Sequence, residues 1–340
     1  MIQLLSWNCQ GLGRALTIQN LGDLTHAHAS SVLFLCETKQ LDFRVNQIRR
    51  QFGFYKGRSI KPIDSAGGLT FWWKPDVNVE FLFSSKYFID TVITVKCDGY
   101  VFRATWFYGP SYRADKAYFW QSISHLSTNH SCPWICSGDF NEILDSNEKE
   151  GGVSLSWNRP HYLQNFMNCN DLVDIGFCGQ KYTWENRRET NDLIRERLDR
   201  ALVNCHWFTS WLDSSVIHSA RIGSDHFPLI INHVPPHEKS SRSFKFEAMW
   251  VDDPKCGQII QQEWRLLSTN NSFISWNMNL AACKKALDPW SKRKFPNNRK
   301  LINSISSELS LVQACNLIDR IKENELSLEL SRLWDLEETY

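Results

Sequence analysis

The sequence contains no long apolar run and no export signal. No stretch approaches the roughly 20 apolar residues that a helix needs to cross a bilayer. The N-terminus, MIQLLSWNCQGLG, has neither the basic leading region nor the long apolar core of a signal peptide. We therefore expect a soluble intracellular protein.

A disulfide framework and an excess charge of either sign are also missing. The eleven cysteines include no Cys-x-x-Cys pair, which argues against a framework of bridges and favours a reducing compartment. Lys and Arg number 38 against 37 Asp and Glu, so no overall field draws the chain to nucleic acid or to acidic membranes. Any binding of a polyanion must therefore be local.

Apolar and aromatic residues are plentiful, with 42% hydrophobic residues, 15 Trp and 20 Phe in 340 residues. A chain of this length can bury one domain of roughly 230 residues together with a smaller element. Helical patterns at about residues 14–29, 112–129 and 159–171 lie between short runs typical of strands. This mixture predicts an α/β protein with two packed sheets and helices outside. The strand-like runs occupy residues 2–9, 31–38, 68–73, 78–85, 90–97, 100–109, 134–140, 196–203, 214–221 and 228–234.

The character of the sequence changes near PPHEKSSR (235–242), and from about residue 257 the pattern is helical. Ile302, Ile305, Leu309 and Val312 follow a 3-4-3 spacing. This spacing predicts an amphipathic extension that packs on itself or on the main domain; the alternative, a coiled-coil partner, lacks sustained heptads. We expect a domain at 1–235, a linker at 236–256 and a helical extension at 257–340.

Polar residues recur where the apolar runs stop, and the ends of strands are where α/β sheets usually bind ligands. Considered singly, each of these polar residues is equally explained as an ordinary turn residue. Five such places in distant parts of the chain favour a shared site. The residues are Asn8, Glu37, Tyr108, Asp139, Asn141, Asp225 and His226.

The stretch SGDFNEIL (137–144) illustrates the two readings. In an extended segment Asp139 and Asn141 face the same side while Phe140 points to the core. Gly138 permits a bend or a close approach. A carboxylate can orient or deprotonate water, and an amide can hold a charged oxygen. Taken alone, the stretch is equally consistent with a turn.

The remaining strand-end residues suit a hard cation and water. Glu37 ends an apolar run where an unpaired charge is costly, so a divalent cation, with Asn8 nearby, or a salt bridge is expected. Asp225 and His226 place an acid beside an imidazole. The sequence offers no Gly-rich phosphate loop and no Ser or Cys nucleophile with a matching base motif. This inventory favours attack by water on a phosphate ester.

Eight motifs carry a resemblance that covers essentially all of residues 1–234. They are SWNCQGLG (6–13), FLCETK (34–39), FYGP (107–110), SGDFNEIL after Trp134, EKEGG (148–152), YTW (182–184), RERLDRALVN (195–204) and GSDHFPLI (223–230). In this order they resemble the endonuclease/exonuclease/phosphatase superfamily, the fold of apurinic-site nucleases. More narrowly, they are similar to the endonuclease domain of plant non-LTR (LINE-type) retrotransposons. The resemblance implies a four-layer sandwich of two mixed β-sheets flanked by helices.

The same resemblance implies roles for the strand-end residues. Glu37 and Asn8 would hold Mg²⁺, with Mn²⁺ as a substitute, and Asp225 would contribute to the metal site. Asp139 would position or deprotonate the attacking water, and Asn141 would steady it. The other implied roles are contact of Tyr108 with the scissile phosphate, transition-state stabilisation by His226, and a hydrogen bond from His226 to Asp199. For Asp199 the alternative is a salt bridge to Arg197 or Arg200.

Contacts with DNA are implied at a second group of residues. Trp184 would lie near DNA, although a core role is the alternative. Arg187, Arg188, Arg195 and Arg197 could contact phosphates or line a solvated loop. Two positions depart from the family pattern: Trp106 stands where many relatives have Asn, and Gln10 replaces a common Arg.

The resemblance implies a DNA-nicking endonuclease that leaves a 3′-hydroxyl for target-primed reverse transcription. A nuclear location and a reverse transcriptase domain not contained in this chain would accompany that function. Two alternatives remain: a phosphatase of the same fold, and a silent retroelement remnant that only binds nucleic acid.

Overall fold

The computed structural model describes residues 2–63, 67–126, 132–156, 158–188, 192–211, 214–232, 250–251, 253–264, 272–294, 298–314 and 319–338. The chain divides into two compact units. One consists of Met1–Pro235 with Leu309–Glu323, and the other of Pro236–Glu308 with Asn324–Tyr340. None of the helices in the described ranges is long and apolar enough to cross a membrane.

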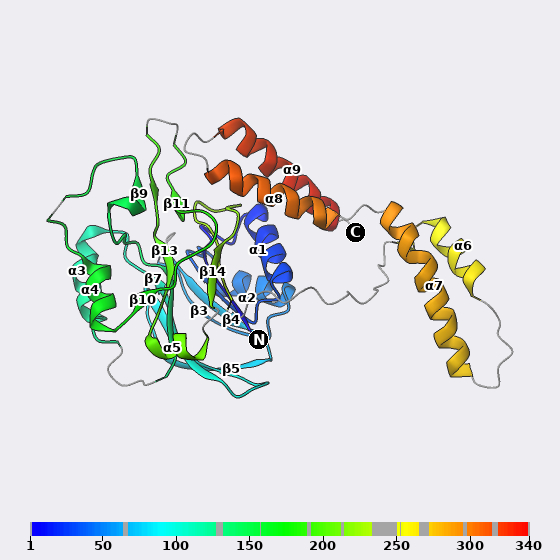
Figure 1. Cartoon of the computed structure of the whole chain (residues 1–340), viewed down its shortest axis with the longest axis horizontal. Coiled ribbons are helices and arrows are strands. Elements are labelled where there is room, and N and C mark those ends of the chain that lie inside the picture. Colours follow the sequence, from blue (N-terminus) through cyan, green and yellow to red (C-terminus); the bar gives the residue numbers. More distant parts are fainter. Residues whose placement is uncertain are drawn as a thin grey trace. The chain divides into compact units, whose positions relative to one another are not determined.

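A first mixed sheet has the strand order β14-β15-β1-β2-β4-β3 (Figure 1). Strands β1 and β2 run parallel, and the other neighbours run antiparallel. The strands are continuously apolar where they are central: VLFLC in β2 is buried at every position. Their bounds are β1 (Gln3–Asn8), β2 (Val32–Cys36), β3 (Lys56–Ile60), β4 (Leu69–Trp73), β14 (Ser215–His218) and β15 (Leu229–Asn232).

A second mixed sheet has the order β10-β13-β8-β7-β6-β5, with β7 and β8 parallel. A small third sheet joins β11, β12 and β9. The bounds are β5 (Val77–Ser84), β6 (Phe88–Val95), β7 (Val101–Tyr108), β8 (Trp134–Asp139), β9 (Lys149–Glu150), β10 (Val173–Asp174), β11 (Trp184–Glu185), β12 (Arg195–Glu196) and β13 (Asp199–Val203).

Aromatic side chains fill the core between the two large sheets. The ring of Trp106 lies 5.8 Å from that of Phe34 and 5.5 Å from that of Phe71. Its indole Nε1 donates a hydrogen bond to Thr91 Oγ1 at 3.3 Å. One of the two positions at which the sequence departs from the family pattern is therefore occupied by a fully buried core residue.

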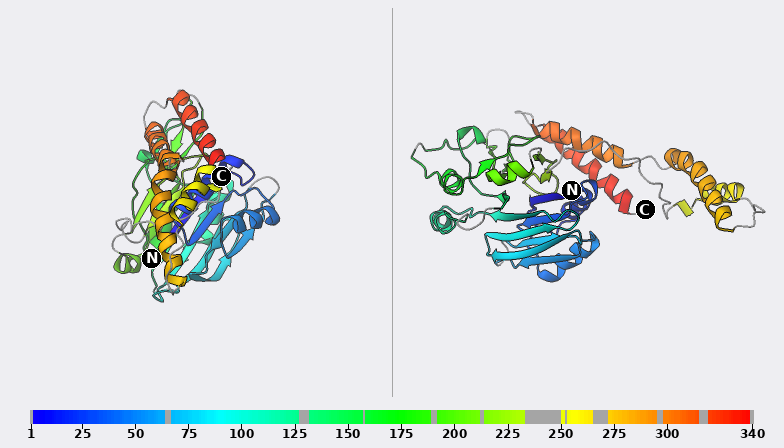
Figure 2. Two further views of the ribbon diagram at one scale, coloured as in Figure 1. Left: turned by 90° about the vertical axis from the view of Figure 1, so that its right-hand side faces the viewer. Right: turned by 60° about the horizontal axis from the view of Figure 1, so that its bottom comes forward.

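Helices cover the outer faces of both sheets, giving four layers. Helices α1 and α2 pack on the first sheet, and α3 and α4 pack on the second. Figure 1 and the right-hand view of Figure 2 show the strands between these two pairs. The predicted α/β sandwich is confirmed. The bounds are α1 (Ala15–Ala27), α2 (Asp42–Gln51), α3 (Arg113–Ser122), the 3₁₀ turn η1 (Ser146–Glu148), α4 (Tyr162–Cys169) and α5 (Cys205–Ser210).

Each strand-like run of the sequence contains residues of at least one strand, but several elements were not predicted. Helix α2 (DFRVNQIRRQ) carries only a few apolar residues, so it shows a weak periodicity. The edge strand β3 (KGRSI) is mostly polar. The predicted helix at 112–129 is too long, because α3 ends at Ser122; residues 127–129 lie outside the described ranges.

The C-terminal part of the chain is helical where it is described. Asp253 begins α6 by accepting a hydrogen bond from the Lys255 backbone N–H at 2.8 Å, and Pro254 occupies the first turn. Residues 236–249 and 252 of the predicted linker lie outside the described ranges. The domain boundaries at 235 and 256 therefore remain predictions. The helices are α6 (Pro254–Glu263), α7 (Ser272–Lys294), α8 (Asn298–Ala314) and α9 (Arg320–Glu338).

Candidate active site

The ends of five strands, β1, β2, β7, β8 and β13, bring predicted site residues together. In the parallel pair β7/β8 Tyr108 lies beside Asp139, and in the antiparallel pair β8/β13 Asp139 lies beside Asp199. Asn8 ends β1, and Glu37 directly follows β2, its parallel neighbour. The convergence thus results from strand register in the two facing sheets.

Four buried side chains form one hydrogen-bonded cluster, which we call the acid–histidine cluster: Asn8, Asp139, Asp199 and His226. Each is at most 3% exposed. Asn8 Nδ2 donates to Asp139 Oδ2 at 2.9 Å and lies 3.3 Å from His226 Nε2. His226 Nδ1 lies 2.8 Å from Asp199 Oδ2, and its Nε2 lies 3.8 Å from Asp139 Oδ2. The structure therefore brings an acid to each nitrogen of one imidazole.

The turn after β8 explains the SGDFN stretch. Gly138 has φ +137°, and a Cβ there would lie 2.1 Å from the Phe107 carbonyl oxygen, so no other residue fits without displacing the backbone. Asn141 adopts a left-handed φ of +52°. Its backbone N–H donates to Asp139 Oδ1 at 2.9 Å, and its Nδ2 donates to the Gly109 carbonyl at 2.8 Å. The stretch therefore forms a turn, and its Asn141 also holds the Asp139 carboxylate in place.

Glu37 belongs to a second, adjoining group. The Tyr108 hydroxyl donates to Glu37 Oε1 at 2.9 Å, and Lys39 Nζ lies 2.8 Å from Oε2. The salt bridge considered for Glu37 is therefore present, with Lys39 as its partner. Burial and the nearby Glu37 carboxylate raise the pKa of Tyr108, so its phenol is a hydrogen-bond donor at neutral pH.

Asp225 lies at the edge of the cluster and not within its hydrogen bonds. Its Oδ2 accepts from Trp184 Nε1 at 3.1 Å and from Gln10 Nε2 at 3.4 Å. Its Oδ1 is buried and has no partner among the described residues. The Trp184 ring lies 6.5 Å from the ring of His226. Trp184 is thus beside the site, half-buried, with its indole oriented by Asp225.

Of the four arginines considered for phosphate contacts, two face inward. Arg197 forms ion pairs with Glu148 at 2.9 Å and Asp174 at 2.8 Å, and Arg195 pairs with Glu150. The prediction that these two could contact phosphates was wrong, because both are buried. Arg187 and Arg188, which follow β11, are exposed residues, and the Arg187 guanidinium donates to the Ser224 carbonyl. In place of the alternative considered for Asp199, a salt bridge to Arg197 or Arg200, the structure pairs both arginines with Glu148 and Asp174, and Asp199 with His226.

Two residues that position the cluster were missed. Thr183 Oγ1 accepts from the backbone N–H groups of Leu198 and Asp199, both at 2.9 Å, and so fixes the start of β13. Ser224 Oγ donates to the Asn8 carbonyl at 2.7 Å and accepts from the His226 N–H at 3.1 Å. The only sequence signal was their presence in the YTW and GSDH motifs.

Burial and charge oppose each other within the cluster. Burial raises the pKa of Asp139 to about 7, although His226 and Asn8 partly offset it. Burial disfavours the charged form of His226, but Asp199 and Asp139 outweigh it and raise the pKa of His226 to about 10. The imidazole is therefore protonated at neutral pH, and Asp139 titrates near neutrality.

The donor set fits a hard divalent cation. Among the described residues, Asp139, Asp199 and His226 offer ligand atoms within 4.8 Å of one another. The direct bond between His226 and Asp199 accounts for that pair without an ion. The unpartnered Oδ1 of Asp225 and the carboxylate of Glu37 are oxygen donors of the kind that Mg²⁺ prefers.

A two-sheet α/β sandwich that gathers acids and a histidine at its strand ends defines the class of fold and site. A model of the endonuclease/exonuclease/phosphatase family matches residues 5–226, and the chain belongs to this family. No curated protein matches the chain.

Three solved structures to which this chain is similar are the following. The AP endonuclease LMAP from Leishmania major is 16% identical, with 68% of this chain and 86% of that chain covered and a TM-score of 0.50. An AP endonuclease from Archaeoglobus fulgidus is 13% identical, covers 68% and 99%, and has a TM-score of 0.50. The endonuclease domain of TRAS1, a telomere-specific non-LTR retrotransposon, is 13% identical, covers 70% and 100%, and has a TM-score of 0.49.

Proposed function

We propose that the chain is a Mg²⁺-dependent phosphodiester hydrolase that nicks DNA and leaves a 3′-hydroxyl, as the endonuclease of a LINE-type retroelement. One observation carries the hydrolase proposal: two buried carboxylates flank one imidazole at converging strand ends. The sequence motifs shared with LINE-type endonucleases support the substrate. Under this proposal the partner is DNA and the location is the nucleus. A reverse transcriptase domain not contained in this chain would be a further partner.

The residues that would hold the cation are Glu37, Asn8 and Asp225. When bound, Mg²⁺ would offset charge on the phosphoryl oxygens and ease attack by water. Lys39 now neutralises Glu37 and would have to share that carboxylate. Mn²⁺ has the same preference for oxygen ligands and would substitute.

Proton transfer from water is assigned to Asp139. A general base works best with a pKa near the operating pH, and burial raises the pKa of Asp139 to about 7. Asn8 and Asn141 each donate an amide hydrogen bond to its Oδ2, at 2.9 and 3.2 Å, and so hold the carboxylate in place. Water bound at Asp139 would thus meet a carboxylate with a fixed orientation.

Charge stabilisation is assigned to His226. Asp199 orients the ring through Nδ1, and with its raised pKa the imidazole also carries a proton on Nε2, the nitrogen nearer Asp139. A protonated Nε2 can donate to a phosphoryl oxygen as negative charge grows on it. The Tyr108 phenol, a donor at neutral pH, would contact the same phosphate. Trp184 and Arg188 are proposed DNA contacts beside it.

Plasmid nicking tests the proposal. Supercoiled plasmid is incubated with the full chain and Mg²⁺, with or without EDTA, beside Asp139→Asn and the exposed control Asp171→Asn. We expect Mg²⁺-dependent relaxed circles with the wild type and the control, and none with Asp139→Asn. Nicks that a DNA polymerase extends without prior phosphatase treatment would establish the 3′-hydroxyl.

Two other outcomes would assign the alternatives. Intact plasmid together with inorganic phosphate released from inositol phosphates or from 3′-phosphorylated DNA would indicate a phosphatase of this fold. DNA binding without either reaction would indicate a silent remnant. Either outcome would contradict the endonuclease proposal.

A further inference from the structure

A short C-terminal segment belongs to the same compact unit as the nuclease fold. Residues Leu309–Glu323 group with Met1–Pro235, although more than seventy positions separate them in sequence. The described part of this segment contributes Gln313, Arg320 and Glu323. Gln313 and Glu323 are 3% and 8% exposed, so their polar groups must find partners inside the unit.

Arg221 is the main partner of the segment. Its Nη2 donates to Glu323 Oε1 and to Glu185 Oε1, both at 2.7 Å, and its side chain is 2% exposed. Gln313 bonds the backbone of Arg221 on both sides: its Oε1 accepts from the Arg221 N–H at 3.4 Å and its Nε2 donates to the carbonyl at 3.1 Å. The segment therefore fixes both the backbone and the side chain of Arg221.

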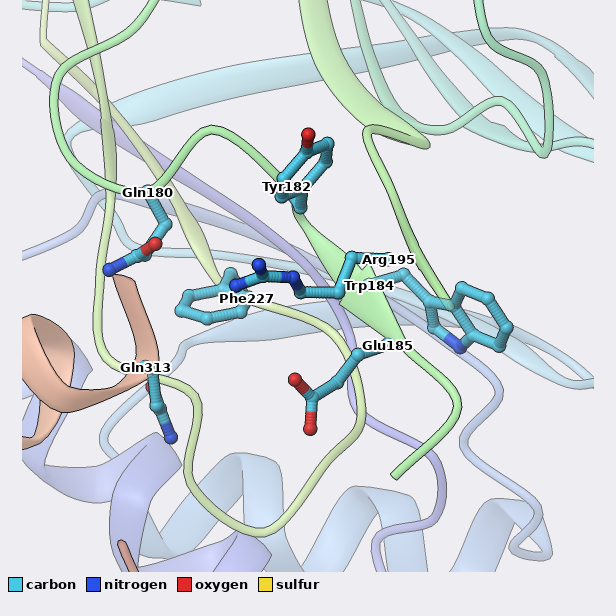
Figure 3. A pocket seen from close by; sticks show the side chains of 7 residues that line it. All are labelled: Gln180, Tyr182, Trp184, Glu185, Arg195, Phe227 and Gln313. Atoms are coloured by element: carbon cyan, nitrogen blue, oxygen red, sulfur yellow. The ribbon is translucent and has the colours of Figure 1, made fainter. Parts of the chain in front are cut away.

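Glu185 is the second partner. Arg320 Nη1 donates to Glu185 Oε1 and to Glu323 Oε2, both at 2.7 Å, and its Nη2 donates to the Arg188 carbonyl at 3.2 Å. In Figure 3 the Glu185 carboxylate extends from β11 between the Trp184 indole and the side chain of Gln313. Burial disfavours ionised Glu323, but Arg221 and Arg320 outweigh it and hold the pKa of this carboxyl below its usual value.

Both partners are adjacent to site residues. Glu185 follows Trp184, and its backbone N–H donates to the Asp225 carbonyl at 3.3 Å. Trp184 forms a β-bridge with His226, and the Phe227 N–H donates to the Thr183 carbonyl at 2.9 Å. Arg221 lies four residues before Asp225. A displacement of Glu185 or Arg221 would therefore be transmitted to the edge formed by Trp184 and Asp225.

We propose that Leu309–Glu323 is a positioning segment that sets the Trp184–Asp225 edge, with Gln313, Arg320 and Glu323 as its positioning residues. Arg320 and Glu323 of the segment form ion pairs with Glu185 and Arg221, so removal of either one would leave a buried opposite charge short of a partner. The hydrogen bonds described above join these residues to Arg221, Glu185 and Arg188, which lie beside the binding edge. The segment acts on the binding edge more than on the hydrolytic step.

The test uses the full chain with Glu323→Gln and Gln313→Ala, and with Glu325→Gln as an exposed control on α9, the helix that carries Glu323. Hydrogen exchange is measured at residues 183–188 and 221–226. We expect faster exchange there in both test variants and unchanged exchange in the control. In plasmid nicking, which rests on the proposed function, we expect KM to rise about threefold to tenfold while kcat changes less than about twofold.

The two readouts separate failure of this inference from failure of the proposed function. If no variant cuts DNA, the exchange rates still decide the positioning role. Unchanged exchange at 183–188 and 221–226 would overturn it, and so would a loss of kcat with KM unaltered. If Glu323→Gln does not fold, Gln313→Ala decides by the same criteria, because it leaves the four charges in place.

Discussion

Two charged clusters include residues of β13 or residues just before it, and they differ in the balance between acidic and basic groups. Asp199 faces His226 and Asp139, so two carboxylates share one imidazole. Arg197 and Arg200, two residues before it and one after, face Glu148 and Asp174. We call the latter the balanced cluster, because two guanidinium groups meet two carboxylates there. Neighbouring residues of one segment therefore belong to two clusters, one with more acids than basic groups and one with equal numbers of both.

The two clusters shift the pKa values of their buried acids in opposite directions. In the balanced cluster the arginines outweigh the effect of burial and lower the pKa values of Glu148 and Asp174, so ionisation favours the folded state. In the acid–histidine cluster burial prevails over the imidazole at Asp139 and raises its pKa. A buried acid that is costly to ionise is typical of a functional site.

The largest expected effect is on catalysis. Asp139→Asn should reduce Mg²⁺-dependent nicking by about 10³-fold or more, because it removes the proposed base and one partner of His226. Initial rates on supercoiled plasmid measure the loss. Retention of more than a tenth of the activity would contradict the role of Asp139.

Breaking the balanced cluster should chiefly cost stability. Glu148→Gln leaves Arg200 and Arg197 short of a carboxylate and should lower the free energy of unfolding by about 3 kcal/mol. Urea denaturation at pH 7.5 measures it, with exposed Glu325→Gln as the matched control. An unchanged midpoint would show that the network contributes little.

Cation binding should stabilise the folded protein. Mg²⁺ at about 100 times its dissociation constant should raise the free energy of unfolding by about 2.7 kcal/mol. Glu37→Gln should weaken this gain, since Glu37 is a proposed ligand. Thermal melts over a Mg²⁺ or Mn²⁺ titration provide the measurement. A wild type insensitive to both ions would argue against the proposed metal site.

The smallest expected effect is on the free energy of unfolding of Asp139→Asn, and its sign is opposite to that expected for Glu148→Gln. The pKa of Asp139 is raised from 3.8 to about 7 in the folded state, so its protonated form stabilises folding at low pH, and this contribution is lost as pH rises through about 7. Without metal, Asp139→Asn should therefore stabilise the protein by about 1 to 2 kcal/mol at pH 8 and by less at pH 5. Destabilisation by this variant at pH 8 would contradict the contrast between the clusters.

Much of the fold was readable from apolar runs, because central strands such as VLFLC in β2 are buried at every position. The polar edge strand β3 and the charged helix α2 were missed, since their few apolar residues leave little periodicity. At the site, strand-end positions indicated Asp139 and His226. Pairings across long separations, such as Arg200 with Glu148 or Arg221 with Glu323, depend on tertiary register and leave no local signal.

The backbone at Gly138 shows how the site can be lost without the loss of any charged group. Every other amino acid has a Cβ, and at this position that atom would lie 2.1 Å from a carbonyl oxygen of the neighbouring strand. One substitution here would displace the strand end that carries Asp139 while every acid and the histidine stayed in the sequence. An inventory of charged residues would not reveal that loss, and only the missing glycine would.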